Sequence, residues 1–286
     1  MKDIKTEVAL CNSYIKSVSF DVQSSNNFRQ VLSHPNPLAR YGRQMFSQAF
    51  EDGITLEIMS RIKPELRHEF FLEIGSGDGT QNNTLALAAL GWDGVWVDCM
   101  PLHYQLPNNS RVSFYQRKVN TETACDIALN ALEKASKKNY DAVSIDVDGI
   151  DYYITEGLLK SGIRPNLWII EYNALFIPPV KFVIDYDPNN TWDRSSHYGA
   201  SLQSLVNLMH RYGYCLVCCT PATGTNAFFV PRGVMYAFTD VPDSIEDIYV
   251  GPHYRLDINF GHPIGVKLIQ HLLDKTKTYH TQTGQA

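Results

Sequence analysis

The sequence predicts an α/β protein built on a largely parallel sheet with helices on both faces. Short apolar runs of strand length alternate with segments of helical periodicity through the middle of the chain. This alternation is typical of a parallel sheet, because each crossover helix covers one face. We expect strands at 70–74, 94–98, 112–117, 142–146, 167–171, 214–219 and 226–230, the last two forming an antiparallel pair, and helices at 81–90, 122–137, 152–161 and 201–212.

A glycine-rich turn follows the first expected strand. The strand ends at Glu73, and Gly75, Gly77 and Gly79 then alternate with other residues. Glycines allow a sharp turn and a close approach of a ligand to the backbone, and the helix start beyond adds partial positive charge. A dinucleotide-binding turn would place its third glycine one position later, where this chain has Thr80. The turn therefore disfavours a nicotinamide oxidoreductase.

A second acidic residue completes this part of the pattern. The next expected strand, 94–98, ends at Asp98, about 25 residues after Glu73. In nucleotide-binding α/β folds an acid at this place accepts hydrogen bonds from ribose hydroxyls. We therefore expect Asp98 to bind the ribose of a nucleoside cofactor.

Composition limits the classes of function. The chain has 286 residues, 44% of them hydrophobic, and a net charge of −5 without a long basic block. This balance disfavours nucleic acid as a partner. No apolar run reaches membrane-span length, and the first residues lack a signal-peptide core. We expect a soluble cytoplasmic protein with no membrane partner.

Polar side chains gather where the fourth and fifth expected strands end. Asp146 and Asp148 follow the fourth strand, and Glu171 and Asn173 follow the fifth. Carboxylates this close repel one another unless a positive group lies between them. Two interpretations stay open: a site for a divalent cation such as Mg²⁺ or Mn²⁺, held by Asp146, Glu171 and Asn173, or acids that serve cofactor, substrate and proton transfer without metal. The first is similar to the site of cation-dependent O-methyltransferases.

A histidine stands at the end of the irregular stretch 174–199. His197 immediately precedes the segment that opens the helix at 201–212. Its ordinary pKa near 6.5 suits a general base that takes a proton from a hydroxyl or an amine. We expect 174–199 to shape an acceptor pocket and His197 to act in it.

Taken together, the motifs resemble those of FkbM-like methyltransferases, which belong to the class I S-adenosylmethionine-dependent enzymes with a Rossmann-like seven-stranded sheet. The resemblance covers roughly residues 40–232. In order, its motifs are Ser47-Gln48-x-x-Glu51-Asp52-Gly53, the glycine turn, Asp146-x-Asp148-Gly149, Glu171-x-Asn173, Tyr198-Gly199-Ala200-Ser201 and Asn226-Ala227-Phe228-Phe229-Val230.

The resemblance implies methyl transfer from S-adenosylmethionine to a small polar acceptor, favouring a hydroxyl oxygen, in natural-product or surface-polysaccharide biosynthesis. Glu73 and the Gly75–Gly79 backbone would hold the methionine end of the cofactor, Asp98 the ribose and Asn120 the adenine. Asp146 would lie near the methionine amine or a metal. Asp148, Glu171, Asn173 and His197 would face the acceptor, with His197 and Asp148 as catalytic candidates.

Three regions follow from this comparison: an N-terminal helical or irregular cap at 1–45, the methyltransferase domain at 46–235 and a C-terminal extension at 236–286, with a helical pattern near 264–274. A homodimer is compatible with the sequence. Two other functions stay open. A carboxylate-rich metal-dependent hydrolase would leave the glycine turn and Asp98 unexplained, and a non-catalytic S-adenosylmethionine-binding protein would differ only in lacking turnover.

Overall fold

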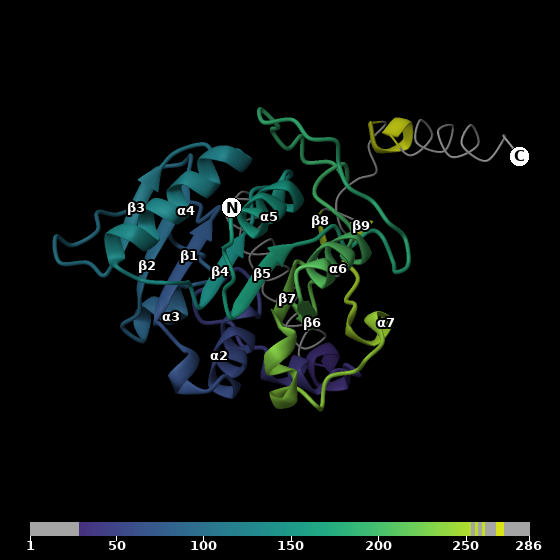
Figure 1. The fold of residues 1–286 in the computed structure, drawn as a ribbon. Coiled ribbons are helices and arrows are strands. Elements are labelled where there is room, and N and C mark those ends of the chain that lie inside the picture. Colours follow the sequence, from purple (N-terminus) through teal and green to yellow (C-terminus); the bar gives the residue numbers. More distant parts are fainter. Residues whose placement is uncertain (1–28, 253–254, 257–258, 261–266, 272–286) are drawn as a thin grey trace, which may run out of the picture.

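A mixed seven-stranded sheet forms the centre of the molecule, with helices on both sides (Figure 1). The computed structural model describes residues 29–252, 255–256, 259–260 and 267–271. The strands of the sheet are β1 (Phe70–Ile74), β2 (Asp93–Asp98), β3 (Val112–Gln116), β4 (Ala142–Ile145), β5 (Leu167–Glu171), β6 (Tyr214–Cys219) and β7 (Asn226–Pro231), and a separate pair is formed by β8 (Arg255–Leu256) and β9 (Asn259–Phe260).

The strand order is β3-β2-β1-β4-β5-β7-β6. Strands β1 to β5 run parallel, and β7 pairs antiparallel with both β5 and β6. The order reverses at β1, so the carboxyl ends of β1 and β4 flank the switch point where ligands bind in open α/β sheets. This order, with its one reversed strand, is the class I methyltransferase topology, so the predicted fold class is confirmed.

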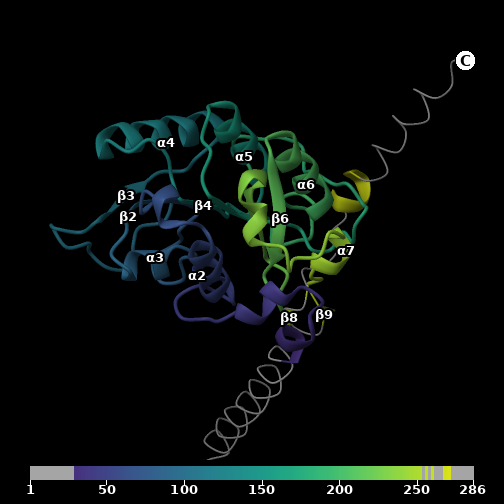
Figure 2. The ribbon, with the colours of Figure 1, turned by 60° about the horizontal axis from the view of Figure 1, so that its bottom comes forward.

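Helices cover the two faces of the sheet (Figures 1 and 2). Strand side chains alternate between the faces, so Leu72 packs into one core with α4, α5 and α6, while Phe71 packs into the other with α2, α3 and η1. The helices are α2 (Glu51–Arg61), α3 (Leu85–Ala89), α4 (Thr121–Ala135), α5 (Asp151–Lys160), α6 (Leu202–Arg211) and α7 (Ile245–Ile248), with 3₁₀ turns η1 (Pro37–Tyr41), η2 (Pro64–Leu66) and η3 (Arg232–Ala237). None of the helices in the described ranges has the length and apolar character of a membrane span.

Two expectations from the sequence change in detail. The helix expected at 81–90 contracts to α3, because the residues before it form a turn instead of continuing the helix. The helical pattern near 264–274 is present at 267–271, and the rest of it lies outside the described residues.

Residues of the N-terminal cap and of the C-terminal extension contribute to the cores of the sheet. Leu38 of η1 and Phe238 lie in the core beside Phe71, and the Asn36 amide nitrogen donates to the Val217 carbonyl at 2.7 Å. Residues 1–28 of the cap lie outside the described chain. The domain boundaries at 45 and 235 stay predictions.

The two ends of the irregular stretch 174–199 lie close together at the carboxyl end of β5. The Asn173 N–H donates to the Ala200 carbonyl at 2.8 Å, and Val183 forms an isolated antiparallel bridge with Ala200. The two ends of the stretch therefore meet beside β5, while the residues between them project over the carboxyl ends of the strands (Figure 1).

Candidate functional site

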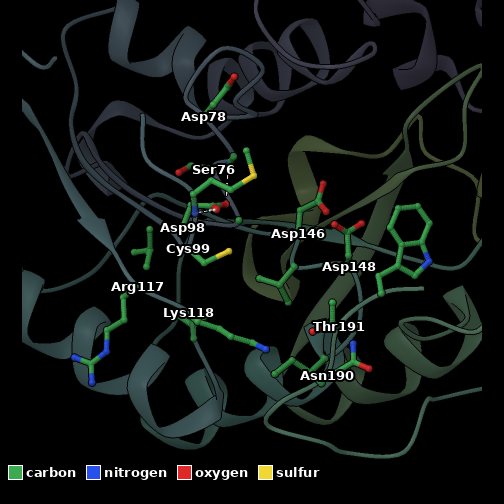
Figure 3. Close-up of a pocket in the computed structure, with 18 of the residues that line it drawn as sticks. Ser76, Asp78, Asp98, Cys99, Arg117, Lys118, Asp146, Asp148, Asn190 and Thr191 are labelled. Carbon is green, nitrogen blue, oxygen red and sulfur yellow. Dashed lines mark hydrogen bonds between the residues drawn. The ribbon is translucent and has the colours of Figure 1, made fainter. Parts of the chain in front are cut away.

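A cavity of about 880 Å³ lies at the carboxyl ends of β1, β2, β3 and β4 (Figure 3). Its volume falls within the usual range of small-molecule sites. The wall combines the glycine turn, the ends of β2 and β4 and the tip of the 174–199 stretch. Its residues are Gln48, Gly75, Ser76, Gly77, Asp78, Thr80, Gln81, Val97, Asp98, Cys99, Met100, Arg117, Lys118, Val119, Asp146, Val147, Asp148, Ile150, Pro188, Asn190, Thr191, Trp192 and Arg194.

The glycine turn places bare backbone against this cavity. Gly75 has φ +91°, and an added Cβ would lie 1.5 Å from the Asp146 carbonyl oxygen, so glycine is required there for packing. Gly77 has φ +55°, and an added Cβ would meet no described atom within 4 Å. Gly77 therefore leaves open space on the cavity side, as a ligand that touches the backbone requires.

Asp98 fixes the turn and lines the cavity. Its Oδ2 accepts a hydrogen bond from the Gly77 N–H at 2.7 Å, and its Oδ1 accepts one from the Met100 N–H at 2.7 Å (Figure 3). Each carboxylate oxygen keeps a further lone pair for a ligand. The structure thus brings Asp98 and the glycine turn together, as their spacing predicts.

Glu73 has a different place from the predicted one. Its buried carboxylate accepts from the Asn83 N–H at 2.8 Å, the Thr84 N–H at 3.1 Å and the Thr84 hydroxyl at 2.5 Å. It is absent from the described lining of the cavity. Glu73 therefore holds the start of α3 through these hydrogen bonds, and its predicted contact with the cofactor stays a prediction.

Burial raises the pKa of Glu73 from 4.5 to about 7, although three hydrogen bonds favour the charged form. The folded protein therefore holds more protons than the unfolded chain between these pH values, and its free energy of unfolding falls as pH rises from about 4.5 to 7. Because glutamine does not titrate, we expect the free energy of unfolding of Glu73→Gln to fall by roughly 3 kcal/mol less than that of the native protein over this pH range. Urea unfolding at pH 5 and pH 8 measures it, with the exposed Glu65→Gln as control. An unchanged slope in Glu73→Gln contradicts the assignment.

Three carboxylates converge beside the cavity. Asp146 and Asp148 follow β4, Glu171 ends β5, and one oxygen of each lies within 4.8 Å of the others. Burial, followed by repulsion from the other acids, raises the pKa of Asp146 and Glu171 well above ordinary values. Glu171 Oε2 is buried and finds no hydrogen-bond partner in the described part of the chain. The cluster predicted from the strand ends is thus present.

Asp148 has the most accessible carboxylate of the three. Its φ of +56° turns the chain after β4, and Figure 3 shows its carboxylate beside that of Asp146. Burial and the nearby Asp98 raise its pKa. Asp151 holds this turn by accepting from the Val147 N–H at 2.7 Å and the Gly149 N–H at 2.9 Å.

Asn173 lies apart from its predicted role as a metal ligand. It is buried, and its amide nitrogen donates to the Ser196 carbonyl at 2.9 Å and the Tyr198 carbonyl at 3.0 Å. Its amide oxygen accepts from the Leu175 N–H at 3.2 Å. Asn173 therefore links the two ends of the 174–199 stretch, and its role as a metal ligand stays a prediction.

His197 also lies away from its predicted place. Among the described residues, those that line the cavity do not include it. Its ring centroid lies 6.1 Å from that of Phe182 and 5.2 Å from that of His271. Burial, followed by the charge of His271, lowers its pKa. The structure therefore places the His197 ring against Phe182 and His271, and its predicted role as a base stays a prediction.

Asn120 caps α4 instead of lining the cavity. Its side-chain oxygen accepts from the Thr123 N–H at 2.9 Å, and the Thr123 hydroxyl accepts from the Asn120 N–H at 2.9 Å. The described lining at this point consists of the preceding residues, Lys118 and Val119. The predicted adenine contact of Asn120 stays a prediction.

The Ser47–Gly53 motif brings a residue to the cavity that sequence reasoning left without a role. Asp52 Oδ2 accepts from the N–H groups of Met45, Phe46 and Ser47 at 2.7–2.9 Å, which fixes the loop before α2. Gln48 at the end of this loop lines the cavity. The only sequence signal for Gln48 was its place in this motif.

Comparisons with known proteins give a likeness among solved structures. No family model and no curated protein sequence matches the chain. Among solved structures, it is similar to an O-methyltransferase family protein from Burkholderia thailandensis, with 13% sequence identity, 75% of this chain and 70% of that chain covered, and a TM-score of 0.33. A likeness of this size says nothing of activity, so the assignment to the class I methyltransferase fold rests on the chain's own strand order.

Proposed function

We propose that this protein transfers a methyl group from S-adenosylmethionine to a hydroxyl oxygen of a small-molecule acceptor. One observation carries the proposal. On a sheet with class I methyltransferase topology, the N–H of Gly77, whose Cα faces open space at the cavity, donates a hydrogen bond to Asp98, the acid that ends β2. An acid in that place suits ribose hydroxyls, and bare backbone suits a ligand that lies against it.

The residues present fit this cofactor. Asp98 would accept from the ribose hydroxyls with its remaining lone pairs. The backbone at Gly77 and the hydroxyl of Ser76 would hold the methionine end. Ser76 lines the cavity, and its Oγ is buried with no hydrogen-bond partner among the described residues. A buried hydroxyl left without a partner costs free energy, which a ligand carboxylate would recover.

The chemistry asks little of the protein beyond alignment and removal of one proton. The cofactor supplies a methyl group already activated by its positive sulfur. The acceptor oxygen forms a bond to the methyl carbon, the carbon–sulfur bond breaks with its electron pair left on sulfur, and the hydroxyl proton goes to a base. Asp148 is the base we assign, because it faces the cavity and its raised pKa makes it a better proton acceptor.

Calorimetry with S-adenosylhomocysteine tests the cofactor. We expect Asp98→Ala to weaken binding by about 1.5–3 kcal/mol, the value of hydrogen bonds to a charged group. The exposed Asp243→Ala, remote in sequence from the lining residues, serves as control. Binding of NAD without S-adenosylhomocysteine would overturn the proposal, as would equal affinities in the two folded variants.

A divalent cation at Asp146, Asp148 and Glu171 is a second part of the proposal. Carboxylate oxygens are the ligands that Mg²⁺ and Mn²⁺ prefer, and a cation would offset the repulsion that raises these pKa values. Glu171 Oε2, buried without a partner in the described chain, supports it.

Thermal unfolding with and without metal tests the cation. At a Mn²⁺ concentration about 100 times the dissociation constant, binding adds roughly 2.7 kcal/mol to the free energy of unfolding. We expect a higher Tm for the native protein and no shift for an Asp146→Asn, Glu171→Gln double variant. Equal shifts in both, together with full methyl transfer after chelation, would reject the cation.

We also propose an FkbM-like relation and, with it, a role in natural-product or surface-polysaccharide biosynthesis. The contact between the first and last motifs of the series supports it. Glu51 Oε1 accepts from the Asn226 amide nitrogen, the Thr220 hydroxyl and the Thr225 hydroxyl, each at 3.1 Å. Motifs far apart in sequence are thus joined by side-chain hydrogen bonds. Methyl-transfer assays with hydroxylated intermediates of the two kinds of pathway test this relation.

A further inference from the structure

The cavity has a cationic side that the cofactor does not require. Lys118 follows β3, and Arg194 lies in the 174–199 stretch together with Asn190 and Thr191; all four line the cavity. We call these four residues the donor wall. Figure 3 shows Ser76 and Asp98 on one side of the cavity and Lys118, Asn190 and Thr191 on the opposite side, with Asp146 and Asp148 along the wall to the right of Asp98.

The donor wall holds hydrogen-bond donors that the protein does not use. The Lys118 ammonium donates to the Asn189 carbonyl at 3.1 Å, which leaves two of its three N–H groups. Within the described residues, no hydrogen bond or ion pair engages the guanidinium of Arg194, which is exposed and carries five N–H donors. Exposed cations with unused donors are common on protein surfaces. Here, however, Lys118 and Arg194 line the same cavity and lie beside the same loop.

The charge of the cofactor explains why the donor wall is not needed to bind it. S-adenosylmethionine has two positive groups and a single carboxylate, and the proposed pose places that carboxylate at Ser76. Two further cations near the adenosine would repel the cofactor's net positive charge, unless an anion lies between them and it. The wall therefore points to an anion in the other ligand.

We propose that the acceptor carries a phosphate group, which binds to Lys118 and Arg194 while its hydroxyl faces Asp148. A dianion matches two cations, and Arg and Lys donors form short, charge-assisted bonds to phosphate oxygens. Asn190 and Thr191 would add neutral donors beside it. The inference rests on the proposed methyl transfer and names its class of substrate: a small organic phosphate with a free hydroxyl.

Binding of three probes with the same carbon skeleton tests it. Protein saturated with S-adenosylhomocysteine is titrated with glycerol 3-phosphate, glycerate and glycerol, and binding is followed by NMR. We expect glycerol 3-phosphate to bind about tenfold more tightly than glycerate, with no binding of glycerol, and to weaken with salt. Equal or tighter binding of glycerate would overturn the phosphate assignment.

Substitutions in the donor wall locate the site. We expect Lys118→Gln and Arg194→Gln each to weaken glycerol 3-phosphate about tenfold, and Arg194→Lys to restore part of the loss. Lys138→Gln removes the same charge from an exposed position just before β4, at the other edge of the sheet, and should change nothing. Equal weakening by Lys138→Gln would reduce the effect to net charge and overturn the proposal.

The cofactor serves as the internal reference in this experiment. If the native protein binds S-adenosylhomocysteine but not glycerol 3-phosphate, or if Lys118→Gln and Arg194→Gln bind glycerol 3-phosphate as tightly as the native protein does, the phosphate inference fails and the proposed methyl transfer stands. If S-adenosylhomocysteine does not bind even to the native protein, the proposed function itself fails.

Discussion

Asp148→Asn should lower methyl-transfer turnover by about 10²–10⁴-fold, the usual contribution of a general base. Asparagine keeps the shape of the side chain and tolerates the left-handed backbone at φ +56°, so the fold should persist. It removes the carboxylate that accepts the proton. Single-turnover transfer, measured with saturating acceptor once the acceptor is known, isolates the chemical step from binding.

Two comparisons make this result specific. His197→Ala should keep turnover within about twofold, since its ring packs against Phe182 and His271 rather than on the cavity. With divalent cations removed by a chelator, the pH profile of the native protein should show a rise in rate as Asp148 loses its proton, at a pH above the ordinary range of an aspartate. A large loss in His197→Ala with native rates in Asp148→Asn would reverse the two roles.

Gly75→Ala should destabilise the protein strongly, by about 3 kcal/mol or more. The added methyl carbon would lie 1.5 Å from the Asp146 carbonyl oxygen, and φ +91° is unfavourable for alanine in any case. Relief requires β1 and β4 to separate at the cavity, so binding of S-adenosylhomocysteine should be lost as well. Urea unfolding and calorimetry measure the two effects.

Substitutions at two other glycines distinguish the cost of backbone strain from the loss of contact with the cofactor. Gly77→Ala adds a methyl group to open space at φ +55°, and Gly91→Ala does the same at φ +88° in the turn before β2. Each should cost about 1–2 kcal/mol of stability from the backbone alone. Only Gly77→Ala should also lower affinity for S-adenosylhomocysteine. Equal affinities in both variants would show that no ligand approaches Gly77.

The sheet could be predicted from sequence because its strands are short apolar runs between helical segments. All seven strand positions agree with the structure within a residue or two. Asp98 and the glycine turn were found by the same means, since their spacing is set by one β-α-β unit. The contraction of the expected helix at 81–90 to α3 depends on Glu73, which bonds the Asn83 and Thr84 N–H groups from a different element.

The site residues that the structure places away from the lining of the cavity share one physical feature. Glu73, Asn120 and Asn173 stand at the ends of strands or before a helix, where a polar side chain serves equally to bind a ligand or to satisfy backbone groups. Sequence spacing is the same in both cases. His197 and the donor wall depend on the path of an irregular stretch, which has no periodicity to read, so Lys118 and Arg194 could not be paired in advance.

The closure of 174–199 has an evolutionary consequence. Its ends are joined by main-chain contacts between Asn173, Val183 and Ala200, while its tip supplies one wall of the cavity. Loops closed in this way tolerate insertion and replacement at small cost to the rest of the fold. The segment between the closed ends can therefore diverge, or be exchanged between homologues, without disturbing the strands that hold the cofactor. New acceptor preferences would then arise by changes in this one stretch, while the sheet that holds the cofactor stays the same.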